Sequence, residues 1–126
     1  MHRLGGSVIS TENPESFYDF ASSGHFEDTI SMVNQYADLI VLRHPDSSLV
    51  YRAADVSSIP VINAGGSDQH PTQALLDLYT IYRAIDGIDG VSVVLMGDLA
   101  HSGATRSLCY FLTKYSGVRL WLVSPK

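Results

Sequence analysis

The stretch Pro60-Val61-Ile62-Asn63-Ala64-Gly65-Gly66-Ser67-Asp68-Gln69-His70-Pro71-Thr72-Gln73 decides the fold of this chain. Its first five residues are typical of a short strand, and the glycines that follow indicate a turn. His70 then opens an apolar-periodic run that predicts a helix to about Ile85. Pro71 suits the first helical turn because its missing N–H would be unpaired there in any case. The sequence therefore predicts a strand, a glycine turn and a helix in succession.

The start of this helix is a candidate anion site. A helix N-terminus offers unpaired N–H groups and a partial positive charge. His70 and Gln73 add side-chain hydrogen-bonding groups to the same opening turn. The combination predicts a small cradle for a phosphate or an oxyanion, with a group beside it that can polarise a carbonyl.

Strands and helices alternate along the rest of the chain. The strands are apolar runs and do not alternate with polar residues, which is typical of a parallel sheet buried on both faces. We therefore expect an α/β fold with a parallel sheet and helices on both faces. The turn-rich link 86–90 predicts a boundary between two lobes, residues 1–87 and 88–126. Further strands are expected at 4–9, 37–42, 91–96 and 118–123, and further helices at 25–36, 48–54 (capped by Asp46 or Ser47) and 103–115.

Composition limits the classes of partner. The chain has 126 residues, 45% of them hydrophobic, and a formal charge of −5, which argues against binding nucleic acid or an anionic membrane. No apolar run is long enough for a membrane span, and the start lacks a signal-peptide core, so a cytoplasmic location is the simplest expectation. The single Cys109 excludes an internal disulfide and disfavours a cysteine-based metal site.

Polar residues follow the predicted strands in clusters at 43–45, 65–73 and 97–106. Ligands of parallel sheets bind at the carboxyl ends of the strands. Taken together, the clusters resemble the aspartate/ornithine carbamoyltransferase family, in its aspartate carbamoyltransferase version. The resemblance rests on ordered motifs: Met1-His2-Arg3-Leu4-Gly5, Asp28-Thr29-Ile30-Ser31, Leu42-Arg43-His44-Pro45, Pro60-Val61-Ile62-Asn63-Ala64-Gly65, His70-Pro71-Thr72-Gln73-Ala74-Leu75-Leu76-Asp77-Leu78-Tyr79-Thr80-Ile81 and Val94-Leu95-Met96-Gly97-Asp98-Leu99.

The resemblance implies the end of a carbamoyl-phosphate lobe joined to the start of an amino-acid lobe, in a homotrimer. It implies that Arg43, His70 and Gln73 bind carbamoyl phosphate, with Arg43 and His70 as the catalytic groups. His101 and Ser102 match the acceptor side. Transfer to an amine needs no metal, covalent intermediate or cofactor, so none is expected. L-Aspartate is the simplest acceptor.

The chain departs from the family's pattern at cationic positions. The family's main phosphate-binding turn, Ser-x-Arg-Thr-Arg, does not occur in it, and the loop 11–23 has no Lys or Arg. Gly103 stands where the family commonly has an Arg that grips the acceptor's carboxylate, and nearby Arg106 is not assumed to replace it. We therefore expect an incomplete chain that is inactive alone. A transferase with another acceptor, and a non-catalytic homologue serving as an assembly or regulatory subunit, remain alternatives.

Overall fold

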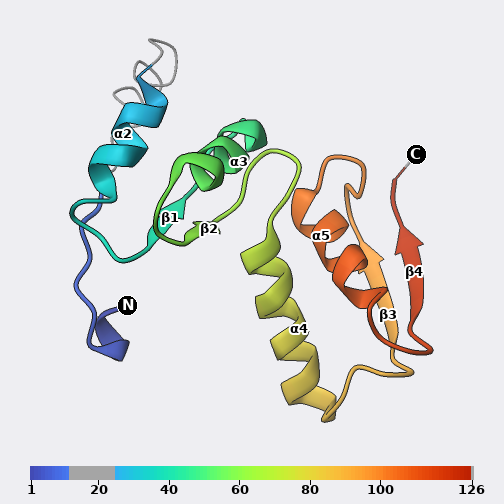
Figure 1. Ribbon diagram of the computed structural model, residues 1–126. Coiled ribbons are helices and arrows are strands. Elements are labelled where there is room, and N and C mark those ends of the chain that lie inside the picture. The colour runs from blue at the N-terminus through green and yellow to red at the C-terminus, as the bar shows by residue number, and fades with distance from the viewer. Residues whose placement is uncertain (12–24, 126) are drawn as a thin grey trace.

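The computed structural model describes residues 1–11 and 25–125 and is an α/β structure in which helices alternate with parallel strands (Figure 1). Between the N-terminal turn and the last strand, the order of elements follows the alternation that the sequence predicts. The elements are η1 (His2–Leu4), α2 (Phe26–Val33), β1 (Ile40–Leu42), α3 (Ser47–Val56), β2 (Val61–Asn63), α4 (Pro71–Ile85), β3 (Ser92–Met96), α5 (Gly103–Leu112) and β4 (Arg119–Val123).

The first half of the structure is built around β1 and β2, which pair in parallel with Ile40 opposite Val61. Helices α2 and α3 cover one face of this pair. Asp46 caps α3, because its Oδ1 accepts a hydrogen bond of 2.9 Å from the backbone N–H of Ser48. Of the two predicted caps, Asp46 is therefore the one used. The buried residues form a first core of Phe26, Ile30, Ile40, Leu42, Leu49, Val50 and Ala53.

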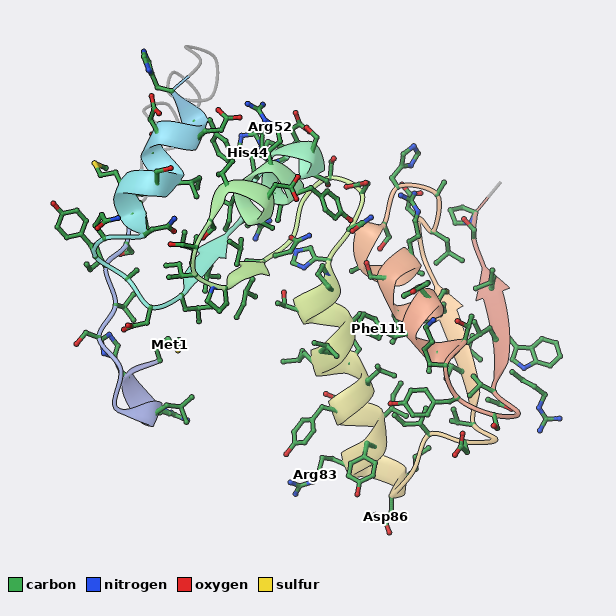
Figure 2. The ribbon with its side chains drawn as sticks, viewed as in Figure 1. Met1, His44, Arg52, Arg83, Asp86 and Phe111 are labelled. Atoms are coloured by element: carbon green, nitrogen blue, oxygen red, sulfur yellow. The ribbon has the colours of Figure 1, made fainter. Side chains whose placement is uncertain are left out.

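The second half is built around β3 and β4, which also pair in parallel, with Ser92 opposite Arg119. Helices α4 and α5 pack against each other and cover one face of this pair. Figure 2 shows Phe111 of α5 directed toward α4. The buried residues form a second core of Ala74, Leu78, Ile88, Leu108 and Leu112.

The predicted parallel pairing of strands is confirmed, but the prediction of helices on both faces of the sheet is wrong for the described residues. The described residues form two separate two-stranded sheets, each covered on one face. The apolar runs did predict strands, but the second face of each run is exposed: Val41 and Ile62 in the first sheet, Val94, Met96 and Trp121 in the second. An apolar run shows that a strand suits burial on both faces, whereas actual burial depends on which other elements are present.

The predicted strand at 4–9 is also wrong. A short 3₁₀ turn occupies His2–Leu4, and the described residues after it, 5–11, are exposed and form no strand. A strand is stabilised by hydrogen bonds to a neighbour, which sequence periodicity cannot supply. The loop 11–23, which contains no Lys or Arg, lies almost wholly outside the described residues.

Helix α4 confirms the helix predicted from His70, beginning at Pro71 and ending at Ile85. Its buried residues Ala74 and Leu78 pack with the second core, so α4 belongs to the second half. The boundary between residues 87 and 88 stays a prediction. Among the described residues, none of the helices has the length and apolar character needed to cross a membrane.

Candidate functional site

The predicted site residues lie around the loop of residues 64–69, here called the junction loop, which runs from the end of β2 to His70. It begins beside the end of β1, where the backbone N–H of Ala64 donates to the carbonyl of Leu42 at 2.9 Å. Arg43 is the residue that directly follows β1. The parallel pairing of β1 and β2 therefore places Arg43 beside the start of this loop, as expected for the carboxyl ends of parallel strands.

Hydrogen bonds fasten the junction loop to the first half. The Ser67 hydroxyl donates to the carbonyl oxygen of Pro45 at 2.7 Å. The Ser47 hydroxyl donates to the carboxylate of Asp68. Gly66 lies so close to this turn that a Cβ there would be 2.8 Å from the carbonyl oxygen of His44. The clusters at 43–45 and 65–73 are therefore in direct contact.

The second half contacts the same loop from α5. The backbone N–H of His70 donates to the Ser107 hydroxyl oxygen at 2.9 Å. The Arg106 guanidinium donates to the carbonyl oxygen of Asp68 at 3.3 Å and to that of Ala100 at 3.2 Å. A Cβ on Gly103 would be 3.0 Å from the carbonyl carbon of Asp68. All three predicted clusters thus meet at the junction loop.

The His70 imidazole packs directly on the backbone of Gly65. A Cβ on Gly65 would lie 2.4 Å from the His70 Cε1 and Nε2 atoms, and Gly65 has a φ of +109°. Only glycine adopts this backbone angle readily and leaves the space that the ring fills. The Nδ1 of His70 is buried and has no hydrogen-bond partner among the described residues. The close contact with Gly65 therefore restricts the position of the His70 ring.

Gln73 and Arg43 differ in how they are held. The Gln73 Nε2 donates to the Asp77 carboxylate at 2.8 Å, one helical turn further along α4. That bond uses one of the two N–H donors of the amide and leaves its oxygen, Oε1, available as an acceptor. Arg43 is exposed, and no carboxylate of the described residues lies within ion-pair distance of it. Its charge is therefore available to an anion.

The residues predicted on the acceptor side are engaged in local contacts. The His101 Nδ1 lies 2.9 Å from the Asp98 carboxylate, and this hydrogen bond lowers the pKa of Asp98. The Ser102 hydroxyl oxygen caps α5 by accepting from the backbone N–H of Thr105 at 3.2 Å. Asp98 also accepts a hydrogen bond of 3.4 Å from the backbone N–H of His101. His101 and Ser102, the two residues predicted on the acceptor side, therefore both have hydrogen-bond partners close by in the sequence.

Sequence reasoning missed the roles of Asp68 and Ser107. The bond between His70 and Ser107 joins residues 37 positions apart. No motif or periodicity carries such a signal, because it depends on how α4 and α5 pack. Arg106 was noted only for its position near Gly103, and its contact with the junction loop became visible in the structure alone.

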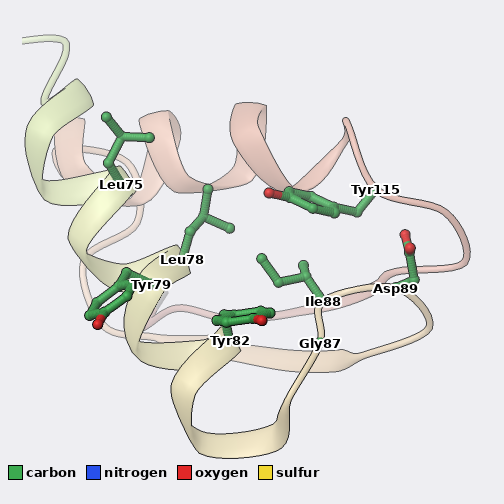
Figure 3. Close-up of a pocket in the computed structure, with 8 residues that line it drawn as sticks. All are labelled: Leu75, Leu78, Tyr79, Tyr82, Gly87, Ile88, Asp89 and Tyr115. Atoms are coloured by element: carbon green, nitrogen blue, oxygen red, sulfur yellow. The ribbon is translucent and has the colours of Figure 1, made fainter.

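An apolar groove of about 460 Å³ lies elsewhere, between α4 and the turn before β3 (Figure 3). Figure 3 shows Tyr82 and Ile88 lining it, with Tyr115 opposite. None of the predicted site residues borders it. Within the described ranges, no group of three or more His, Cys, Asp or Glu side chains could hold a metal ion.

Comparison with known proteins assigns the chain to a family. Residues 1–83 match the sequence profile of the aspartate/ornithine carbamoyltransferase carbamoyl-P binding domain. Aspartate carbamoyltransferase 2 of Pisum sativum, a chloroplastic protein, is 52% identical over the whole chain, which covers 33% of that relative. The aspartate carbamoyltransferase catalytic subunit of Methanocaldococcus jannaschii is 46% identical over the whole chain, covering 41% of it.

Solved structures agree with the sequence comparisons. A crystal form of the catalytic subunit of the M. jannaschii enzyme superposes with a TM-score of 0.90, covering 100% of this chain and 41% of that one. The Trypanosoma cruzi aspartate transcarbamoylase in complex with carbamoyl phosphate superposes with a TM-score of 0.86 at 35% identity, covering 99% of this chain and 39% of that one. This chain thus spans roughly a third to two-fifths of these relatives. It belongs to the aspartate/ornithine carbamoyltransferase family and resembles aspartate carbamoyltransferase catalytic chains over the region that holds the carbamoyl-phosphate-binding domain.

Proposed function

We propose that this chain supplies the donor site for moving a carbamoyl group from carbamoyl phosphate to an amino acceptor. The simplest acceptor is L-aspartate, which would give N-carbamoyl-L-aspartate for pyrimidine biosynthesis. The observation that carries the proposal is the seat of the His70 ring on Gly65, at the start of α4 and beside the end of β1. The T. cruzi relative with a carbamoyl-phosphate complex supports the same choice of donor.

Each donor-side residue has a role that its chemistry allows. The Arg43 guanidinium would hold phosphate oxygens with its planar fork of N–H donors. His70 would donate a hydrogen bond to the carbamoyl carbonyl oxygen and stabilise the negative charge that develops there. The Oε1 of Gln73, left free by the bond from its Nε2 to Asp77, would accept from the carbamoyl NH₂.

The reaction would then be a direct transfer. The lone pair of the acceptor's amine forms a bond to the carbamoyl carbon, and the carbonyl oxygen carries the charge of the tetrahedral intermediate. The bond from carbon to the bridging oxygen then breaks, phosphate leaves with the electron pair, and the nitrogen loses a proton. In these reaction steps, His70 and Arg43 would provide most of the electrostatic stabilisation of the negative charge on the substrate.

We propose further that transfer needs groups outside residues 1–126, contributed within a homotrimer. Of the described residues 97–112, only Arg106 carries a positive side chain, while His101 and Ser102 already have local partners. A location in the cytoplasm stays a prediction. The Pisum relative is named as chloroplastic.

Calorimetric titration with carbamoyl phosphate tests the donor site. The longest chain that contains these residues should bind the ligand, and His70→Ala should weaken binding by roughly thirtyfold or more, as expected for a lost contact to a charged ligand. His2→Ala, an exposed histidine in η1, is the matched control and should bind normally. Equal binding by His70→Ala would remove His70 from the site. Residues 1–126 alone should show no turnover.

The alternative is a non-catalytic homologue that serves as an assembly or regulatory subunit. The engagement of His101 with Asp98 and of Ser102 with the α5 cap favours it, because both groups are held by neighbours. Failure of the unmodified chain to bind carbamoyl phosphate would support this alternative and contradict the donor-site proposal.

A further inference from the structure

Arg106 lies where the two candidate parts of the site meet. Its guanidinium donates to the carbonyl oxygen of Asp68, two residues before His70 in the junction loop. It also donates to the carbonyl oxygen of Ala100, in the loop that carries His101. One cationic group thus contacts both the loop that leads to His70 and the loop that follows β3.

The positive charge of Arg106 is not neutralised by a carboxylate within the described residues. Both of its hydrogen-bond partners are neutral backbone carbonyls. Arg52, in contrast, forms an ion pair with Glu27. The chain as a whole has a charge of −5, so a guanidinium without a carboxylate partner gives this part of the candidate site a local positive charge.

The Arg106 side chain is exposed and can exchange partners. Its hydrogen bonds to Asp68 and Ala100 measure 3.3 and 3.2 Å, at the long end of the usual range. A carboxylate offers two charged oxygens that match the guanidinium fork, and such charge-assisted bonds are roughly twice as strong as neutral ones. A carboxylate ligand can therefore compete with either carbonyl.

Position 103, at the start of α5, has little room for a side chain. A Cβ there would be 3.0 Å from the carbonyl carbon of Asp68 and 3.2 Å from the backbone nitrogen of Gln69, so the junction loop would have to shift. Arg106 is one helical turn further along α5 and already reaches the loop. Arg106 is therefore the residue of α5 that brings a positive charge to the candidate site.

We infer that Arg106 binds a carboxylate of the amino-acid acceptor and is a specificity-determining residue for it. The inference rests on the proposed function, because it assumes that the donor occupies the His70 side. The acceptor carboxylate displaces the carbonyl of Asp68 or Ala100 from the guanidinium.

Two probes separate the donor and acceptor parts of the site. N-(phosphonacetyl)-L-aspartic acid, which the T. cruzi relative binds in a solved complex, combines a donor-like and an acceptor-like part. Phosphonoacetamide has the donor-like part alone. The ratio of their dissociation constants, measured by calorimetry on the longest chain that contains these residues, reports on the acceptor side.

Arg106→Gln should reduce the affinity for N-(phosphonacetyl)-L-aspartic acid by roughly thirtyfold or more, as expected for a lost charge-assisted contact, and leave phosphonoacetamide binding unchanged. Arg106→Lys should retain part of the affinity, because it keeps the charge without the fork. Arg119→Gln removes the same charge from an exposed position on β4 and is the matched control.

The alternative outcomes are distinct. If Arg106→Gln weakens both probes equally, Arg106 only holds the junction loop and the inference is wrong. If it weakens neither, Arg106 has no part in the site, while the donor proposal stands. If the unmodified chain binds neither probe, the proposed function fails and the inference fails with it.

Discussion

The first and second halves of the molecule are built on the same plan but at different scales. Around the first core the strands are three residues long, and around the second they are five. Each half has its own buried cluster, centred on residues such as Phe26 in one and Leu112 in the other. The polar junction loop contacts both halves, so the position of Arg43 relative to α5 depends on a few hydrogen bonds, whereas His70 is also tied to α5 by the apolar packing of α4. The comparison indicates that site geometry can be changed here with little loss of core stability.

Removing a core side chain from each half gives the largest expected effects. Phe26→Ala should cost about 3–5 kcal/mol and Leu112→Ala about 2–5 kcal/mol, because each side chain is almost fully buried and leaves a cavity. If the cores are independent, hydrogen exchange should show each substitution exposing amides mainly in its own half. Exchange that rises equally in both halves would show instead that the cores unfold together.

Gly65→Ala should act on the junction itself. The new Cβ would meet the His70 ring at 2.4 Å in a backbone conformation with φ of +109°. Strain of this kind costs about 1–3 kcal/mol, and the displaced ring should lose its contact with carbamoyl phosphate. Thermal unfolding and calorimetric titration measure the two effects.

Gly87→Ala is the matched control for this prediction, because no atom lies within 4 Å of its Cβ position. It should change neither stability nor carbamoyl-phosphate binding appreciably. Normal ligand binding by Gly65→Ala would show that the seat of the His70 ring is not required by the donor site.

Ser102→Ala tests the acceptor side of the second half. Loss of the N-cap of α5 should destabilise the chain by about 1 kcal/mol, measured by urea unfolding. Ser102→Asp should retain stability, because Asp is an equally good cap. If Ser102→Ala unfolds like the unmodified chain, the hydroxyl is free for a ligand and the cap is unimportant.

The pair of Asp98 and His101 should give the smallest effect. The hydrogen bond from His101 lowers the folded-state pKa of Asp98 below its ordinary value of 3.8. The pair therefore stabilises the fold above that pH, and its contribution is lost as the pH falls through the lowered pKa. Comparing the acid unfolding of Asp98→Asn with that of the unmodified chain below pH 3.8 should reveal this small difference. A titration of Asp98 at its ordinary pKa, followed by NMR, would contradict the pairing.

The sequence by itself determined the local structure of this protein. Periodicity and turn residues predict the helix found at Pro71–Ile85. Asp46 or Ser47 was expected to cap α3, and Asp46 does so. Both features depend on near neighbours in the chain. The ordered motifs were enough to indicate the family. The roles of Arg43, His70 and Gln73 remain predictions that their positions support.

Tertiary structure alone decided how these elements meet. It separated the strands into two pairs, left one face of each pair exposed, and brought Arg106 to the carbonyl of Asp68, 38 residues away. Strand pairing and contacts between helices depend on which surfaces are available to be buried, and an apolar run looks the same whether one or both of its faces find a partner. For the same reason, the seat of His70 on Gly65 and the bond to Ser107 could be read only from the packed structure.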